Sequence, residues 1–328
     1  MSAVDVAVVG RGMIGAAAAR HLVEAGFSCA VIGQAEPDEW ADAEARRASS
    51  GPFSSHNDEG RITRVAGRTM VWAELASRAI SRYHDIAARS GVAFHSPAGL
   101  VVSVAALDDW IDAGLIMGSD IRKVEHGWVQ EQFGIELSEH LPVAYEGPPA
   151  GYINPRRLVA AQSALATHAG ATVIDGIAES VERNNGRFDV GGSWGSTTAD
   201  RVLLATGGFG ASLLEGELQV DRHARTIVLG ETETAAPLPS LIVGEPTPGG
   251  PLAGIYTVPP VTFPDGRRCL KIGGTLFEDR VVNDADALIE HFHGDGDGPE
   301  IEALEASMRA LYPGVAFTSF TSRPCVIT

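Results

Sequence analysis

The sequence predicts an α/β fold, in which a doubly wound, Rossmann-like domain is joined to an α+β domain built on an antiparallel sheet. Three observations predict it. An apolar strand over 4–9 runs into glycines spaced Gly-x-Gly-x-x-Gly, which open a helix over 16–25. A second apolar strand over 29–32 follows at once, as in a βαβ unit. Beyond residue 220, short strands separated by Pro and Gly turns are typical of an antiparallel sheet.

The glycine motif predicts a site for the phosphates of a dinucleotide. Gly10 allows the tight turn, Gly12 lets the backbone approach a pyrophosphate, and Gly15 lets helix and strand pack closely. The helix start, with Met13 and Ile14, offers free N–H groups and the positive end of the helix dipole. The alternative is a glycine-rich turn in another α/β fold.

The end of the second strand departs from the pattern. The acidic residue that usually holds the ribose hydroxyls is replaced by Gly33, and Gln34 or Glu36 could take its role. No arginine suited to a 2′-phosphate stands at the strand end either. This motif alone therefore leaves the choice between FAD and NAD open.

The later elements follow from periodicity and from capping residues. Apolar side chains recur at helical spacing over 70–90, and Asn154 with Pro155 is typical of a helix start. We expect helices over 70–90, 107–118, 156–168, 284–292 and 300–312. We expect strands over 92–95, 99–104, 171–174, within 176–190, and over 199–204, 225–232, 254–258, 269–273 and 317–328. A short helix or loop is expected over 37–48, and irregular structure from 124 to 149.

The length of 328 residues is sufficient for two domains. The pattern assigns 1–95 and 150–215 to the dinucleotide-binding domain, and 96–149 and 216–320 to the substrate domain. Residues 321–328 are expected to start a return to the first domain.

The composition excludes several classes of partner. A net charge of −17 argues against nucleic acid and against anionic membranes. No apolar run is long enough for a membrane span, and the first strand leaves no room for a signal peptide. Three cysteines without metal spacing suit a reducing compartment, so we expect a cytoplasmic protein. His and Asp alternate over 290–298 without the order of a metal loop, which favours a solvated turn and no metal.

The polar loop over 54–64 carries a resemblance to a known family. Its sequence, Ser54-Ser55-His56-Asn57-Asp58-Glu59-Gly60-Arg61-Ile62-Thr63-Arg64, is similar to the Ser-His-Gly-Asp-x-Arg-Ile-x-Arg loop of the monomeric sarcosine oxidase and N-methyltryptophan oxidase family. That family belongs to the glycine oxidase and D-amino acid oxidase superfamily of FAD enzymes. Four further segments match in order: the glycine motif, 203–208, 254–256 with 270–274, and 323–325.

The resemblance implies FAD as cofactor and a small amine or amino acid as substrate. The implied reaction oxidises the C–N bond of an amino acid or N-alkyl amino acid to an imine, with hydride transfer to the flavin. Oxygen would then be reduced to hydrogen peroxide. Two alternatives stay open: a dehydrogenase that uses another acceptor, and a non-catalytic flavin-binding subunit or fragment.

Two arginines receive roles by resemblance. Arg61 would lie over the flavin ring, and Arg64 would pair with a substrate carboxylate, for which the guanidinium fork is well suited. The alternative for two arginines three residues apart is one exposed helix face.

Lys271 matches the lysine that helps oxygen accept electrons, through its positive charge. It is one of only two lysines in the chain, with Lys123, although a surface lysine on a strand edge is the alternative. Tyr256 matches an active-site tyrosine beside the substrate, and otherwise would be a half-buried strand residue. Thr275 and Ile327 replace a histidine and a tyrosine of the sarcosine oxidase pocket, which indicates a different or bulkier amine.

Arg323-Pro324-Cys325 matches two patterns at once. In the sarcosine oxidases the cysteine holds FAD through a thioether, and a nearby cation favours the thiolate that this requires. In the glycine oxidase and D-amino acid oxidase branches the arginine binds the substrate carboxylate. Covalent FAD at Cys325 and substrate binding by Arg323 therefore both remain open. The other implied cofactor contacts are Gln34, Ser55, His56, Val173, Ala205, Thr206 and Gly207.

One segment of the family pattern has no counterpart here. The family continues with a flavin-contacting Gly-x-x-Gly-His-Gly-x-Lys segment, whereas this sequence stops at Thr328 within the expected last strand. A fragment, an omitted segment or a completing partner would each explain this, and weak FAD binding is the expectation for the chain as it stands.

Overall fold

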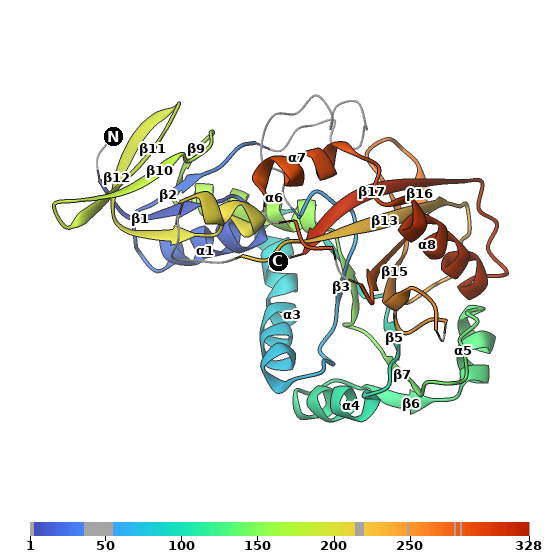
Figure 1. Ribbon diagram of the computed structural model, residues 1–328. Helices are drawn as coiled ribbons and strands as arrows, with labels where there is room; N and C mark the ends of the chain where they lie inside the picture. The colour runs from blue at the N-terminus through green and yellow to red at the C-terminus, as the bar shows by residue number, and fades with distance from the viewer. Residues whose placement is uncertain are drawn as a thin grey trace.

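The structure is a computed structural model, and it describes residues 3–35, 55–213, 220–247, 249–278, 280–282 and 284–327. These residues form two lobes, one around a six-stranded sheet and one around an eight-stranded sheet (Figure 1). The helix or loop predicted over 37–48, and Glu36, lie outside the described residues.

The smaller lobe is built on a mostly parallel sheet with the strand order β10-β11-β12-β1-β2-β9. The strands β12, β1, β2 and β9 run parallel, and β11 is antiparallel to both of its neighbours, β12 and β10. Their bounds are β1 (Val4–Val9), β2 (Cys29–Ile32), β9 (Thr172–Ile174), β10 (Ser180–Asn184), β11 (Arg187–Gly192) and β12 (Gly195–Leu204). Alternate residues of β1 pack on two separate apolar clusters, so both faces of this strand are buried.

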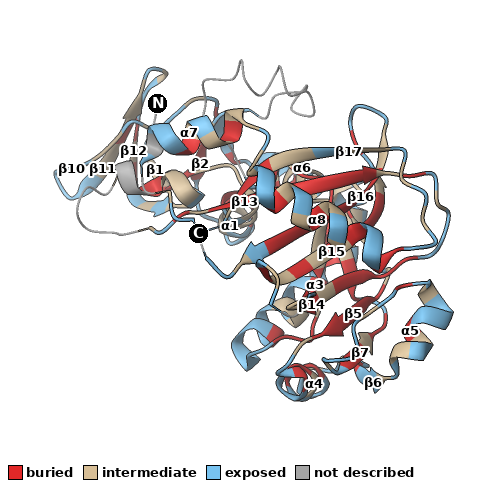
Figure 2. Ribbon diagram, turned by 45° about the vertical axis from the view of Figure 1, so that its right-hand side comes forward, coloured by how far each residue is buried: buried red, intermediate tan, exposed pale blue. Residues whose placement is uncertain are grey.

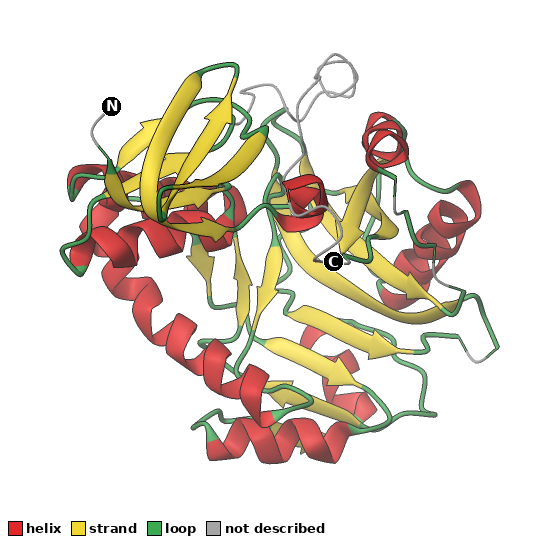
Figure 3. Ribbon diagram, turned by 60° about the vertical axis from the view of Figure 1, so that its left-hand side comes forward, coloured by secondary structure: helices red, strands yellow, loops and turns green. Residues whose placement is uncertain are grey.

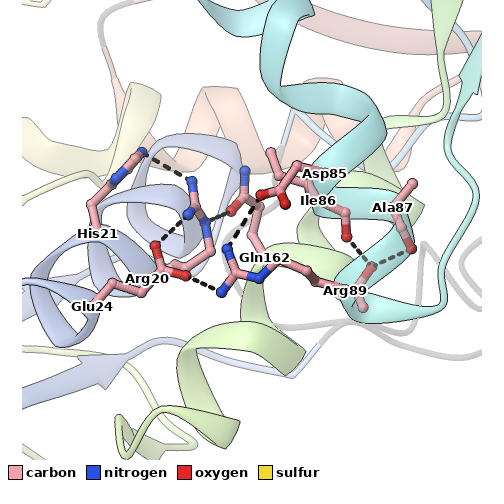
Figure 4. Close-up of polar contacts among 9 residues, drawn as sticks. Arg20, His21, Glu24, Asp85, Ile86, Ala87, Arg89 and Gln162 are labelled. Atoms are coloured by element: carbon pink, nitrogen blue, oxygen red, sulfur yellow. Dashed lines mark hydrogen bonds and ion pairs between the residues drawn. The ribbon is translucent and has the colours of Figure 1, made fainter.

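Helices α1 (Met13–Glu24), α3 (Met70–Ser90) and α6 (Pro155–His168) are tied together by a polar network beside the sheet (Figure 4). Arg20 is buried, and its Nε donates to Gln162 Oε1 at 2.5 Å. Glu24 accepts from Arg20 at 2.5 Å and from Arg89 of α3. One carboxylate therefore joins two helices, and this fixes the direction of α1, whose first turn follows the glycine motif.

The larger lobe is built on a sheet with the strand order β17-β13-β16-β15-β14-β5-β7-β6. Every neighbouring pair is antiparallel except β14 and β5, which run parallel. The bounds are β5 (Leu100–Ser103), β6 (Arg122–Val124), β7 (Val143–Glu146), β13 (His223–Glu231), β14 (Ser240–Gly244), β15 (Leu252–Thr262), β16 (Arg268–Leu276) and β17 (Ser319–Ile327).

Helix α8 (Gly298–Leu311) covers one face of this sheet, where the central strands are buried (Figure 2). Leu304 and Met308 are fully buried against Val228 and Ile272 of β13 and β16. Truncating such a leucine to alanine typically costs about 2–5 kcal/mol. Helix α7 (Ala285–His293) lies beside β17, and Asp284 and Asp297 cap the starts of α7 and α8. The 290–298 segment thus spans the end of α7 and the turn into α8.

A third, small sheet connects the two lobes, with β8 (Gly151–Ile153) between β3 (Arg61–Thr63) and β4 (His95–Ser96). The long helix α3 packs beside it through Tyr83, whose hydroxyl is 3.1 Å from Thr63 Oγ1 (Figure 3). This sheet carries the polar loop at its edge, and so it determines where Arg61 lies.

The predicted fold class is confirmed, with differences in particular elements. The stretch 124–149 is not wholly irregular, because it holds α5 (His126–Phe133) and β7, and α4 is Leu107–Ile116. Helix α5 escaped prediction because it is two turns long and buries only Val129. Strand β15 runs on through Pro259 and Pro260, where a register shift against β16 accommodates prolines that cannot donate to a ladder.

Among the described residues, no helix combines the length and the hydrophobicity needed to cross a membrane.

Candidate functional site

The glycine motif has the close approaches that the sequence predicts. Gly10 has a φ of 111°, and a Cβ there would lie 2.3 Å from the carbonyl oxygen of Ala205. A Cβ on Gly15 would lie 1.9 Å from the carbonyl oxygen of Gly10. Gly12 precedes α1 as its N-cap with no side-chain cap, and Ile14 in the first turn is 74% exposed. The uncapped helix start is therefore available to an anion.

The segment Ala205-Thr206-Gly207 lies next to this motif. The Ala205 N–H donates to the carbonyl oxygen of Val9 at 2.7 Å, which extends the β12–β1 pairing. Gly207 then turns the chain with a φ of 55° into a short 3₁₀ helix, Gly207–Leu213. Val173 lies on the edge strand β9 and is 41% exposed. Gly10 and Ala205 thus lie together at the carboxyl ends of β1 and β12 in the six-stranded sheet, and Val173 lies on its edge strand.

An arginine lies at the end of β2, although no arginine directly follows that strand in the sequence. Arg11, from within the glycine motif, donates through Nη1 to the carbonyl oxygen of Gly33 at 3.0 Å, and lies 3.8 Å from Asp175. A Cβ on Gly33 would come within 2.8 Å of Arg11 Cγ. The missing side chain at the end of β2 thus makes room for Arg11, while Gln34 is exposed just beyond it.

A pocket that is partly open to solvent lies between the polar loop and the strands β13 and β17. Its walls combine charged and polar groups with apolar side chains. The lining residues that carry these groups are Asn57, Asp58, Arg61, Phe263, Arg323 and Cys325.

Three charged groups form a cluster at this pocket. Lys271 of β16 is fully buried, and its Nζ donates to Asp58 Oδ2 and to the carbonyl oxygen of Gly60 at 2.5 Å. Arg61 Nε lies 3.2 Å from the same Asp58 oxygen. Although burial opposes the charge, Lys271 and Arg61 hold the pKa of Asp58 below its ordinary value. Burial lowers the pKa of Lys271, and Asp58 opposes that shift.

Tyr256 of β15 lies beside this cluster. Lys271 Nζ is 5.3 Å from the centre of the Tyr256 ring, and Gly273 on β16 leaves space for its hydroxyl, because a Cβ there would lie 2.6 Å away. Burial raises the pKa of Tyr256 above its ordinary value, so the phenol stays protonated at neutral pH and can donate a hydrogen bond.

The last strand brings two predicted residues to the pocket. Arg61 Nη2 lies 3.9 Å from the sulfur of Cys325. The guanidinium of Arg323 lies 5.0 Å from the centre of the Phe263 ring. Asn57 also lines the pocket, and its Oδ1 is buried and has no hydrogen-bond partner among the described residues. Such an oxygen offers an acceptor to a donor group of a ligand.

The polar loop is held by buried contacts to α6. Glu59 accepts from the side chain of Asn154 and lies 3.3 Å from Arg156. His56 is buried, and burial together with the charges of Arg156, Arg61 and Arg11 lowers its pKa to about 4. His56 is therefore neutral at physiological pH. Ser55 accepts from Arg61 through its carbonyl oxygen at 2.6 Å.

Arg64, Thr275 and Ile327 were predicted for the pocket and do not line it, and neither do the buried Lys271 and Tyr256. Arg64 stacks 4.3 Å from the centre of the Trp110 ring and donates to the carbonyl oxygen of Ala66 at 2.5 Å. Thr275 is exposed near the far end of β16, and Ile327 is 46% exposed. Sequence reasoning missed the buried Glu146, which accepts from the Val65 N–H at 2.9 Å and so holds the segment after Arg64.

Asp58, Asn57 and Phe263 were also missed as site residues. Asp58 stood within the matched loop, so the loop pattern itself was a signal for it. Phe263 gave none, because it reaches the pocket only through the pairing of β15 with β16.

The residues present fit FAD. The glycine cradle and the uncapped α1 suit a pyrophosphate, and the unpartnered Asn57 oxygen beside Arg61 and Cys325 suits the polar edge of a flavin. A dinucleotide-binding lobe next to an antiparallel lobe with a cationic pocket defines the class of two-lobed flavoproteins.

The chain belongs to the DAO family of FAD-dependent oxidoreductases, whose model matches residues 5–326. No curated protein matches the chain in sequence. NikD, an amino acid oxidase essential for nikkomycin biosynthesis, is a similar solved structure: at 18% identity and a TM-score of 0.75, the match covers all of this chain and 82% of NikD.

Two other solved structures are similar in the same way. L-proline dehydrogenase from P. horikoshii matches all of this chain and 82% of its own, with 14% identity and a TM-score of 0.76. Glycine oxidase from Geobacillus kaustophilus matches all of this chain and 84% of its own, with 18% identity and a TM-score of 0.67. At identities this low, the structural similarity shows a shared fold and nothing more specific.

Proposed function

We propose that this FAD-dependent oxidoreductase oxidises the C–N bond of an amino acid or N-alkyl amino acid to an imine, and that oxygen is then reduced to hydrogen peroxide. The observation that carries the proposal is the cluster of Lys271, Asp58 and Arg61 at a pocket that also holds Arg323. Bound FAD supplies the electron acceptor for the C–N oxidation.

The pocket suits a substrate with a carboxylate and an apolar part. Arg323 lines the pocket, where its guanidinium lies 5.0 Å from the centre of the Phe263 ring, and a guanidinium binds a carboxylate bidentately. Ile227, Leu229 and Phe263 provide the apolar wall. We therefore assign carboxylate binding to Arg323, since Arg64 is stacked on Trp110 instead.

Lys271 is the group that distinguishes an oxidase. A fixed positive charge stabilises the negative charge that develops on oxygen as it accepts electrons. At neutral pH His56 is neutral and Tyr256 is protonated, so neither of these two residues adds a charge beside Lys271.

The test is reduction of the protein-bound flavin by a panel of apolar amino acids and N-methyl amino acids without air. We expect bleaching of the flavin absorbance by at least one of them, and peroxide on admission of air. Bleaching without peroxide would assign the chain to the dehydrogenases, a class that includes one of its structural neighbours. No bleaching with any amine would refute the proposed reaction.

We also propose that FAD is attached through Cys325, whose sulfur lies 3.9 Å from the Arg61 guanidinium in the pocket. After acid denaturation and centrifugation, we expect yellow protein in the pellet, and yellow supernatant for Cys325→Ser. Flavin in the pellet of both proteins would exclude Cys325 as the point of attachment.

A further inference from the structure

We propose that Asp58 is the positioning residue for oxygen reduction: its carboxylate holds the Lys271 ammonium and the Arg61 guanidinium at the pocket. The inference rests on the proposed function, because it assigns Lys271 the charge that oxygen requires. It adds a third residue, which neither touches the reacting atoms nor is replaceable by a neighbour in the described structure.

Asp58 joins Arg61, which lines the pocket, to the buried Lys271. Asp58 lines the pocket, and the fully buried Lys271 does not. One oxygen, Oδ2, accepts from Lys271 and lies 3.2 Å from Arg61 Nε. The other oxygen, Oδ1, accepts from the Glu59 N–H at 2.8 Å, which fixes the carboxylate to its own loop. One anchored carboxylate therefore contacts both cations.

The groups that face Lys271 come from four elements. The loop before β3 provides Asp58, β3 provides Arg61, β15 provides Tyr256 and β17 provides Cys325. Within the described residues, Asp58 is the carboxylate that contacts Lys271, while Gly60 provides a neutral carbonyl oxygen. Removal of the Asp58 charge would leave Lys271 and Arg61 as unpaired like charges, and a buried ammonium then releases its proton more easily.

The inference therefore predicts a specific change in Asp58→Asn. The substitution keeps the size of the side chain and removes its charge. Lys271 should lose its proton at lower pH than in the unchanged protein, and the rate of flavin reoxidation by oxygen should fall with it. We expect a reoxidation rate about tenfold lower for each pH unit above the new midpoint.

The chain offers an unusually clear readout, because Lys123 and Lys271 are its only lysines. In protein labelled with ¹⁵N-lysine, NMR shows two side-chain amine signals, one from each residue. Lys123 pairs with Asp108 at 2.6 Å on the surface, so Asp108→Asn is the matched control. We expect Asp58→Asn to lower the midpoint of the Lys271 signal, and Asp108→Asn to leave that signal unchanged.

The outcomes separate the inference from a structural role. An unchanged Lys271 titration and an unchanged pH profile of reoxidation in Asp58→Asn would overturn it. If Asp58→Asn does not fold, the double variant Asp58→Asn with Lys271→Met should, because it removes the unpaired charge. Failure of both variants to fold would also refute the inference, because the effect of Asp58 would then not act through Lys271.

The NMR titration also does not depend on substrate. A protein whose flavin is not reduced by amines but whose Lys271 signal responds to Asp58→Asn would refute the proposed function and retain the positioning contact. If amines reduce the flavin but the Lys271 signal does not respond to Asp58→Asn, the proposed function is retained and the positioning role of Asp58 is refuted.

Discussion

The two lysines of this chain are both paired with an aspartate, yet they lie in opposite environments. Lys123 and Asp108 have side chains 61% and 77% exposed, whereas those of Lys271 and Asp58 are 0% and 7% exposed. Water screens the first pair, and an exposed ion pair typically contributes less than about 1 kcal/mol. The second pair is surrounded by protein, where a charge without its partner is strongly destabilising. The same two residue types therefore form a solvent-screened ion pair in one place and a buried ion pair in the other.

Stability alone does not explain why the second pair is buried. Well-packed apolar residues of similar volume are often as stable as a buried ion pair. Retaining a fully buried ammonium beside a pocket is thus best explained by what its charge does there.

The largest expected effect is on folding. Asp58→Ala leaves Lys271 buried without its carboxylate, so we expect a loss of about 3–5 kcal/mol in the free energy of unfolding. Asp108→Ala should lose less than about 1 kcal/mol. Urea unfolding of the two variants beside the unchanged protein measures both. Similar losses would show that burial does not distinguish the two pairs.

The next largest effect is expected on the reaction of the reduced flavin with oxygen. Lys271→Met should lower the rate constant of flavin reoxidation about 10²–10³-fold, the usual loss when a preorganised electrostatic contact is removed. Lys123→Met provides the control and should reoxidise normally. Stopped-flow mixing of reduced protein with oxygenated buffer gives the rate constants, and equal rates for the two variants would remove Lys271 from the oxygen step.

A smaller effect concerns histidines in the same two environments. The pKa of His56 is about 4 in the folded protein and 6.5 when exposed, so the unfolded chain binds more protons between these values. Folding should therefore weaken as the pH falls from 6.5 to 4, by about 3 kcal/mol from this residue. His56→Gln should flatten that dependence in urea unfolding, while His84→Gln, at an exposed site on α3, should not. An unaltered slope in His56→Gln would contradict the assignment.

The sequence predicted the parts of the molecule that local physics determines. The glycine motif, the strands on either side of α1, and the Asn154 cap each follow from residues a few positions apart, and the structure contains all of them. Short elements such as α5 were missed because one buried residue gives no periodicity.

The site was less accessible from sequence. Lys271 and Asp58 meet across 213 positions of the chain, and only the pairing of β16 within the large sheet brings them together. Arg64 shows the converse: its spacing from Arg61 is local, but its direction is determined by Trp110, which belongs to another element. Arg11 reaches the end of β2 because Gly33 has no side chain. The contact depends on the space available in the folded protein, so no sequence pattern predicts it.

The parallel pairing of β5 with β14 has a consequence for synthesis of the chain. Leu100 pairs with Ser240, and between them the chain returns to the small lobe to form α6 and strands β9 to β12. Strand β5 therefore leaves the ribosome long before its partner β14 has been synthesised, with a hydrogen-bonding edge exposed. Each lobe contains segments that are synthesised after parts of the other lobe, so neither lobe can complete its folding before the other has started to fold.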